Sequence, residues 1–176
     1  MTSALLLTGS DACDGAPWMS AVAACQQAST GGVLYQLCVR MLGTSPEAKE
    51  VTGYVVTAMN TNRELFAITE GAADKVRQDP SASEEMKTAC GICMGKYDKS
   101  EVLMFGVKEH LRSCELTMDI RMDLATAAAA VDDCATLLLR AGGDQTPLHR
   151  MVLLDRDRAV LALRLAILLV PNKLQE

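Results

Sequence analysis

Four residues capable of metal or redox chemistry lie in the middle of the chain. Cys90 and Cys93 form a C-x-x-C motif, and His110 and Cys114 follow further along. Thiolate and imidazole groups in such an order are the ligands of many zinc sites. A C-x-x-C pair can also run a thiol–disulfide redox cycle. Which chemistry applies depends on the secondary structure that carries these residues.

The residues around this motif have the periodicity of one long helix. Residues suited to a core recur at alternating intervals of four and three, namely Met86, Cys90, Cys93, Tyr97, Ser100, Met104, Val107 and Leu111. On one helix, Cys93 and His110 would lie roughly 25 Å apart. Zinc ligands must approach to about 2.3 Å of a single ion, so we expect no metal site and no cofactor. A reactive C-x-x-C usually lies at a helix N-terminus, whereas this pair lies inside the helix.

The plainer interpretation is that the cysteines are structural. Cys93 faces the predicted core and bridges to another helix, while Cys90 on a neighbouring row is a buried thiol. Cys25 and Cys38 flank a Gly-Gly turn, and a bridge between them would close a loop worth about 3 kcal/mol. The chain has seven cysteines, so at least one is free or pairs with a second molecule. Such a high cysteine content favours an oxidising compartment.

Helix start and stop signals divide the rest of the chain. Ser45 and Pro46 predict the start of a helix that ends at Asp79, before Pro80. Its predicted core positions are Val51, Val55, Ala58, Asn62, Leu65, Thr69, Ala72 and Val76. A capping box at 81–84 begins the cysteine-bearing helix. A third helix stops at Gly142, and a fourth runs from Thr146 and Pro147 to Pro171.

These elements predict an all-α protein. Residues 45–176 form an antiparallel four-helix bundle, and residues 17–44 form an N-terminal helical hairpin. Residues 1–16 are interpreted as the remnant of a leader or as a disordered tail. The apolar segment 159–170 is too short to span a bilayer, so we expect it to lie half-buried in the bundle.

Composition and charge argue against several classes of function. A net charge of −5 disfavours binding to nucleic acid or to an anionic membrane. Catalysis is not expected, because His110 is predicted near a helix end, where a cation favours the helix dipole, and His149 is predicted at the surface in the first turn of the last helix. Neighbouring acids such as Asp132 and Asp133 point apart on a helix. We therefore expect a binding protein rather than an enzyme.

Five features in order resemble the plant invertase and pectin methylesterase inhibitors. They are the cysteine-flanked hairpin AACQQASTGGVLYQLC, the Ala-rich helix 58–76, CMGKY followed by VKEHL, the run ATAAAAVDDC after Asp119-Ile120, and the terminal AVLALRLAILLV. The resemblance covers about residues 20–171. It implies a four-helix bundle with a hairpin extension, which agrees with the elements predicted above.

The resemblance also implies disulfides, location and function. It implies the pairs Cys25–Cys38 and Cys93–Cys134, and leaves Cys13, Cys90 and Cys114 unassigned. It implies a secreted, monomeric inhibitor in the plant cell wall, with a covalent dimer through a spare cysteine as the alternative. The implied target is a pectin methylesterase whose substrate cleft the bundle blocks. The alternatives are an acid invertase and a non-inhibitory helical binding module on the same scaffold.

Departures from the family pattern bear on the target. Asp133 stands where the family often has Thr, close to the face that members use against pectin methylesterase. The Pro-Lys-Phe tripeptide of invertase-directed members is absent, which disfavours the invertase target. The residues expected to contact the partner are the outward charged positions Asp119, Arg121, Asp123, Asp132 and Asp133.

Overall fold

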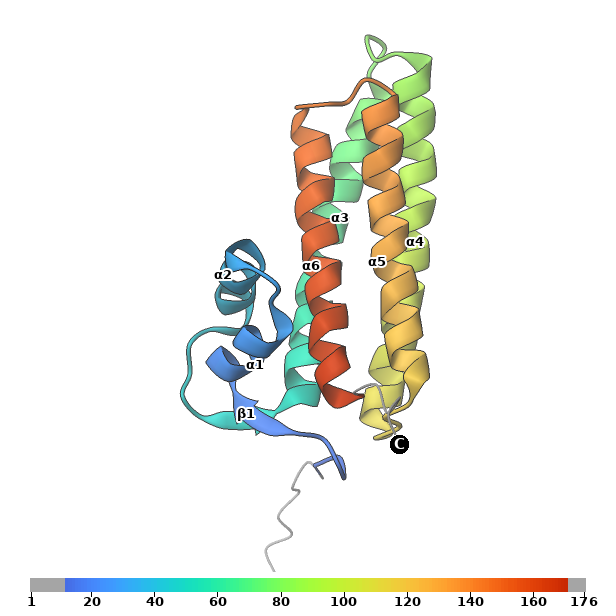
Figure 1. Ribbon diagram of the computed structural model, residues 1–176. Coiled ribbons are helices and arrows are strands. Elements are labelled where there is room, and N and C mark those ends of the chain that lie inside the picture. Colours follow the sequence, from blue (N-terminus) through green and yellow to red (C-terminus); the bar gives the residue numbers. More distant parts are fainter. Residues whose placement is uncertain (1–11, 171–176) are drawn as a thin grey trace, which may run out of the picture.

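Four long helices make up most of the computed structural model, which describes residues 12–170. They are α3 (Val51–Gln78), α4 (Glu84–Arg112), α5 (Met118–Arg140) and α6 (Pro147–Leu169). Each helix packs against the next one along the chain, and α6 closes the bundle against α3 (Figure 1). The predicted all-α, antiparallel four-helix bundle is confirmed.

Two short helices form the predicted hairpin beside the bundle. They are α1 (Ala21–Ala28) and α2 (Gly32–Leu42), which pack on α6 and α3 (Figure 1). Ser20 caps α1 by accepting a hydrogen bond from the Ala23 amide, and the Cys25–Cys38 disulfide joins the two helices. Because the hairpin lies on the α3–α6 side, it leaves the outward face of α5 uncovered.

The first long helix begins later than its sequence signals predict. Ser45 and Pro46 lie in a loop, and residues 48–50 form a short strand β2 (Ala48–Glu50). This strand pairs antiparallel with β1 (Trp18–Ser20), with Met19 opposite Lys49. The backbone of 48–50 therefore bonds to another segment instead of entering the helix. The predicted helix start at Ser45-Pro46 is wrong for this reason.

The cores of α3 and α4 follow the predicted periodicity to different extents. In α4 every predicted position from Cys90 to Leu111 is buried, and Met86 is half-buried. In the second half of α3, Thr69 is buried as predicted, whereas Phe66 and Ala73 are buried in place of their neighbours Leu65 and Ala72. A straight helix has 3.6 residues per turn, so a strict four-three pattern drifts off the core face over several turns.

The ends of α4 and α6 are fixed by side-chain caps. Ser83 and Thr146 accept hydrogen bonds from the amides of Met86 and His149, respectively. The predicted cap of α6 is confirmed. For α4 the capping residue is Ser83 rather than Ser81, whose amide and hydroxyl instead donate to the Asp79 side chain.

Glycine makes the turn between α5 and α6 possible. Gly142 has a φ of 80°, in the left-handed region that favours glycine. The Gly143 amide then donates to the Leu138 carbonyl over 2.8 Å. A Cβ atom on Gly143 would lie only 2.7 Å from that same carbonyl oxygen. This tight turn between α5 and α6 therefore requires a residue without a side chain at position 143.

The N-terminal segment is bonded to the end of the bundle at which α3 begins and α4 ends (Figure 1). Cys13 forms a disulfide with Cys114 in the connection between α4 and α5. The Cys13 amide also donates to the Glu50 carboxylate over 3.0 Å. The prediction of a leader or disordered tail at 1–16 is therefore wrong for residues 12–16, and its remainder, 1–11, lies outside the described residues. Residues 171–176 of the predicted bundle domain also lie outside them.

Candidate functional site

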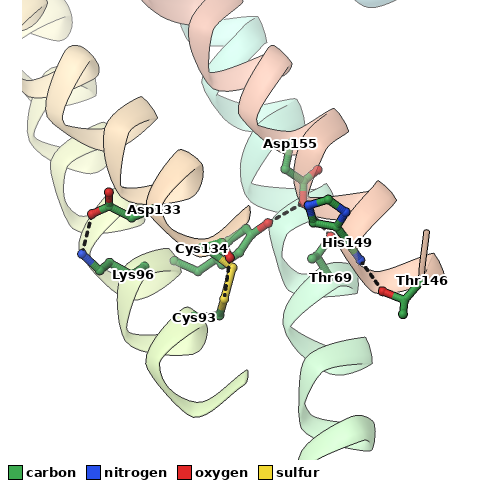
Figure 2. Close-up of a disulfide and its surroundings, with 9 residues drawn as sticks. Thr69, Cys93, Lys96, Asp133, Cys134, Thr146, His149 and Asp155 are labelled. Atoms are coloured by element: carbon green, nitrogen blue, oxygen red, sulfur yellow. Dashed lines mark hydrogen bonds and ion pairs between the residues drawn. A yellow bond between two sulfur atoms is a disulfide. The ribbon is translucent and has the colours of Figure 1, made fainter. Parts of the chain in front are cut away.

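The Cys93–Cys134 disulfide joins α4 to α5 in the bundle core. Both residues are buried, and Figure 2 shows the bond between the two helices. The structure thus contains both pairs that the family resemblance implies, Cys25–Cys38 and Cys93–Cys134. A sulfur in a disulfide offers no thiolate to a metal, so this C-x-x-C is not a pair of zinc ligands. Within residues 12–170, no cluster of His, Cys, Asp and Glu has the arrangement of a metal site.

The charged residues predicted to bind a partner lie along two opposite borders of α5. On the α4 side, Asp133 forms an ion pair with Lys96 at 2.6 Å (Figure 2). On the α6 side, Asp132 lies 3.6 Å from Arg156. Arg121 is on the α6 side as well, where its guanidinium donates to the Val170 carbonyl over 3.1 Å.

Asp119 and Asp123 belong to the α4 border. They are four residues apart, which places them above one another on a helix, and helical phase puts them on the same side as Asp133. Neither carboxylate forms an ion pair with another residue of the described chain. The five predicted residues therefore do not form one patch; they border the outward face of α5 on both sides.

Between the two borders lies a strip of small and apolar side chains that the sequence reasoning missed. We call it the α5 strip, and it consists of Met118, Met122, Ala125, Ala129 and Thr136, all of them exposed. The two methionines expose 47% and 56% of their surface. The spacing of four, three and four residues at the start of this series is itself the signal, because it marks one helix face that is apolar although it points to solvent.

Behind α5, a buried carboxylate connects the other three helices. Asp155 on α6 accepts hydrogen bonds from the Thr69 hydroxyl of α3 at 2.6 Å and the Tyr97 hydroxyl of α4 at 3.0 Å. The Arg158 guanidinium forms an ion pair with the other carboxylate oxygen of Asp155 at 2.7 Å. Burial and the neighbouring carboxylate both raise the pKa of Tyr97, which keeps its hydroxyl a donor. This network fixes α6 against α3 and α4.

The two histidines occupy different surroundings. His110 lies near the end of α4, where its Nδ1 is 2.8 Å from a Glu115 carboxylate oxygen. His149 is buried in the first turn of α6, on the side of Asp155 and Thr69 (Figure 2). The prediction of a surface position for His149 is wrong, because the helical phase of α6 turns this residue inward with Leu148 and Val152.

No protein family, curated protein or solved structure matches the chain. Within the described residues, no helix is long and apolar enough to cross a membrane. Three disulfides are typical of proteins that fold in an oxidising compartment. The α5 strip, bordered by charges and held from behind by a disulfide, is the candidate functional site.

Proposed function

We propose that this protein is a secreted inhibitor that docks the α5 strip onto a plant cell-wall pectin methylesterase and blocks its substrate cleft. The observation that carries the proposal is the α5 strip itself, an exposed apolar face with charged borders. Protein interfaces commonly have an apolar centre within a polar rim. The resemblance of the sequence to pectin methylesterase inhibitors names the target.

The rigidity of α5 supports an inhibitory role. The Cys93–Cys134 disulfide holds the helix from its buried side, and the Lys96–Asp133 ion pair holds its outer edge. A surface that is already ordered loses little conformational entropy when it binds. An inhibitor of this kind performs no chemistry and needs only to present a fixed shape.

The charge of the α4 border suits the proposed target. Pectin is a polymer of galacturonic acid units, so the esterase cleft must accept carboxyl groups along a chain. Asp119 and Asp123 present two carboxylates one helical turn apart, without ion-pair partners in the described chain. In the proposed complex, these carboxylates occupy sites at which the cleft otherwise meets its substrate.

The first experiment titrates the oxidised protein into two assays at mildly acidic pH, one of plant pectin methylesterase and one of plant acid invertase. We expect stoichiometric loss of the esterase activity alone. Loss of the invertase activity alone would assign the second target to the same scaffold. If neither activity falls while all three disulfides are intact, the inhibitor proposal is wrong for these enzymes.

A substitution in the middle of the α5 strip tests the docking surface. Ala129→Arg places a long charged side chain at the centre of the proposed contact, and we expect the inhibition constant to rise at least about 100-fold, equivalent to about 2.7 kcal/mol. Ala67→Arg, at an exposed alanine of α3, is the matched control and should inhibit like the wild type. Equal inhibition by both variants would remove the α5 strip from the interface.

A further inference from the structure

A groove on the outside of the bundle runs between α3 and α4. It encloses about 310 Å³, which is within the range of small-molecule sites. The buried side chains of Met59 and Met104 line it, and its exposed lining includes Val102 and Phe105. Methionine side chains are flexible and adapt to apolar surfaces of different shape, so these two can adjust to a bound molecule.

The exposed apolar side chains in this groove lack a covering partner within the described chain. Val102 exposes 71% of its surface and Phe105 exposes 63%. Both lie on the same side of α4, three residues apart. An isolated exposed apolar residue is ordinary, whereas two beside a concave apolar surface are typical of a binding groove.

Three charged side chains line the groove. Arg63 of α3 and Lys108 of α4 contribute two cations, and Lys108 donates to the Asn60 side chain over 2.9 Å. The Arg63 guanidinium forms no ion pair with any residue from 12 to 170. Glu101 lies seven residues before Lys108 on α4, which is about 10 Å along the helix. The groove therefore combines two cations and one carboxylate with an apolar surface.

We propose that this groove binds a small amphipathic carboxylate. The carboxylate lies between Arg63 and Lys108, and the apolar chain runs over Met59 and Met104 beneath Phe105. Arginine forms strong charge-assisted hydrogen bonds to carboxylates, which favours a position of the head group beside Arg63. Glu101 also lines the groove, where it would repel a second anion but tolerates an alkyl terminus. Octanoate combines one carboxylate with one alkyl chain, as this lining requires.

This site is separate from the α5 strip. The groove is formed by α3 and α4, whereas the strip lies on the outward face of α5. Binding of a small carboxylate therefore neither requires nor excludes the proposed inhibition of an esterase, and each proposal can fail without the other.

The test is a calorimetric titration of the intact, oxidised protein with octanoate, compared with octan-1-ol. We expect saturable binding of one octanoate per chain, and at least about tenfold weaker binding of the uncharged alcohol because it lacks the ionic contacts. Equal affinity for the two molecules, or no saturable binding of octanoate, would overturn the proposal.

Methyl NMR spectra of the methionines locate the bound molecule. We expect octanoate to shift the signals of Met59 and Met104 and to leave those of Met118 and Met122 on the α5 strip unchanged. Shifts confined to the α5 strip would overturn the proposal. Shifts of Met59 and Met104 that depend on protein concentration without ligand would show that a second copy fills the groove, which would also overturn it.

Two double variants with the same change in charge separate the groove from general electrostatics. Arg63→Gln with Lys108→Gln should weaken octanoate binding at least about tenfold. Lys75→Gln with Lys99→Gln removes two cations from exposed positions on the same helices, outside the groove, and should leave the affinity unchanged. Equal weakening in both variants would show that net charge, and not this site, attracts the anion.

Discussion

At the scale of single residues, Glu70 makes the stability of the bundle depend on pH. Burial, together with the nearby carboxylates of Glu101 and Asp98, raises its pKa from 4.5 to about 7. The folded state therefore holds a proton that the unfolded chain has already released between these pH values. Stability linked to this group is greatest at low pH and is lost as the pH rises through about 7.

We expect Glu70→Gln to flatten this dependence, because the amide does not titrate. Urea unfolding of the wild type should give a lower free energy of unfolding at pH 7.5 than at pH 5, and the difference should shrink in the variant. Glu64→Gln, at an exposed position on the same helix, is the control and should keep the wild-type dependence. An identical pH profile for wild type and Glu70→Gln would contradict the assigned pKa.

Asp155 shows what residue patterns could and could not predict about the interior. Leu148, Val152, Asp155 and Ala159 follow intervals of four, three and four, so the buried position of this acid is readable from the sequence. Its partners are not readable, because Thr69 and Tyr97 come from two other helices. The α5 strip was not predicted for a different reason: apolar residues at helical spacing usually mark a buried face, whereas these side chains are exposed.

At the scale of elements, the turn between α5 and α6 depends on the absence of a side chain. We expect Gly143→Ala to destabilise the protein by about 1–3 kcal/mol, because the added carbon would press against the Leu138 carbonyl oxygen. Gly71→Ala should instead stabilise by about 0.5–1 kcal/mol, since this helical glycine faces open space and alanine favours a helix. Thermal unfolding of both variants checks the two signs, and destabilisation of equal size would contradict the steric argument.

Helix ends were predictable where no pairing with a distant segment competes with the local capping signal. Thr146 followed by Pro147 begins α6 as expected, because the cap and the first turn use neighbouring residues only. Ser45 followed by Pro46 carries a similar signal and fails, because β1 pairs with residues 48–50. That pairing joins segments about thirty residues apart in the chain, and no local pattern reports it.

At the scale of the whole molecule, the Cys13–Cys114 disulfide ties the N-terminal segment to the connection after the C-terminal end of α4. The bridge has a sequence separation of 101 residues, so it constrains much of the unfolded chain. We expect the double variant Cys13→Ser with Cys114→Ser to lose about 2–5 kcal/mol and to melt roughly 10 °C lower. Calorimetry of the fully oxidised proteins measures this difference, and unchanged melting would show that the segment adds nothing to the fold.

The bundle as a whole follows from helical periodicity and short connections, both of which the sequence displays. The third disulfide does not, because three cysteines remained unassigned and spacing alone could not choose among them. Only the packed structure shows that Cys13 reaches Cys114 and that Cys90 is left without a partner. Cys90 is also buried, so a covalent dimer through its thiol would require the bundle core to open.

The reactivity of the Cys90 thiol reports how often the bundle core opens. Six of the seven cysteines are oxidised, and the remaining thiol is buried and has its pKa raised by burial. A coloured thiol reagent can therefore reach it only when the core is transiently exposed. The rate of the reaction in native buffer therefore measures how often the core opens. In denaturant, reaction of one thiol per chain shows that the other six cysteines are in disulfides.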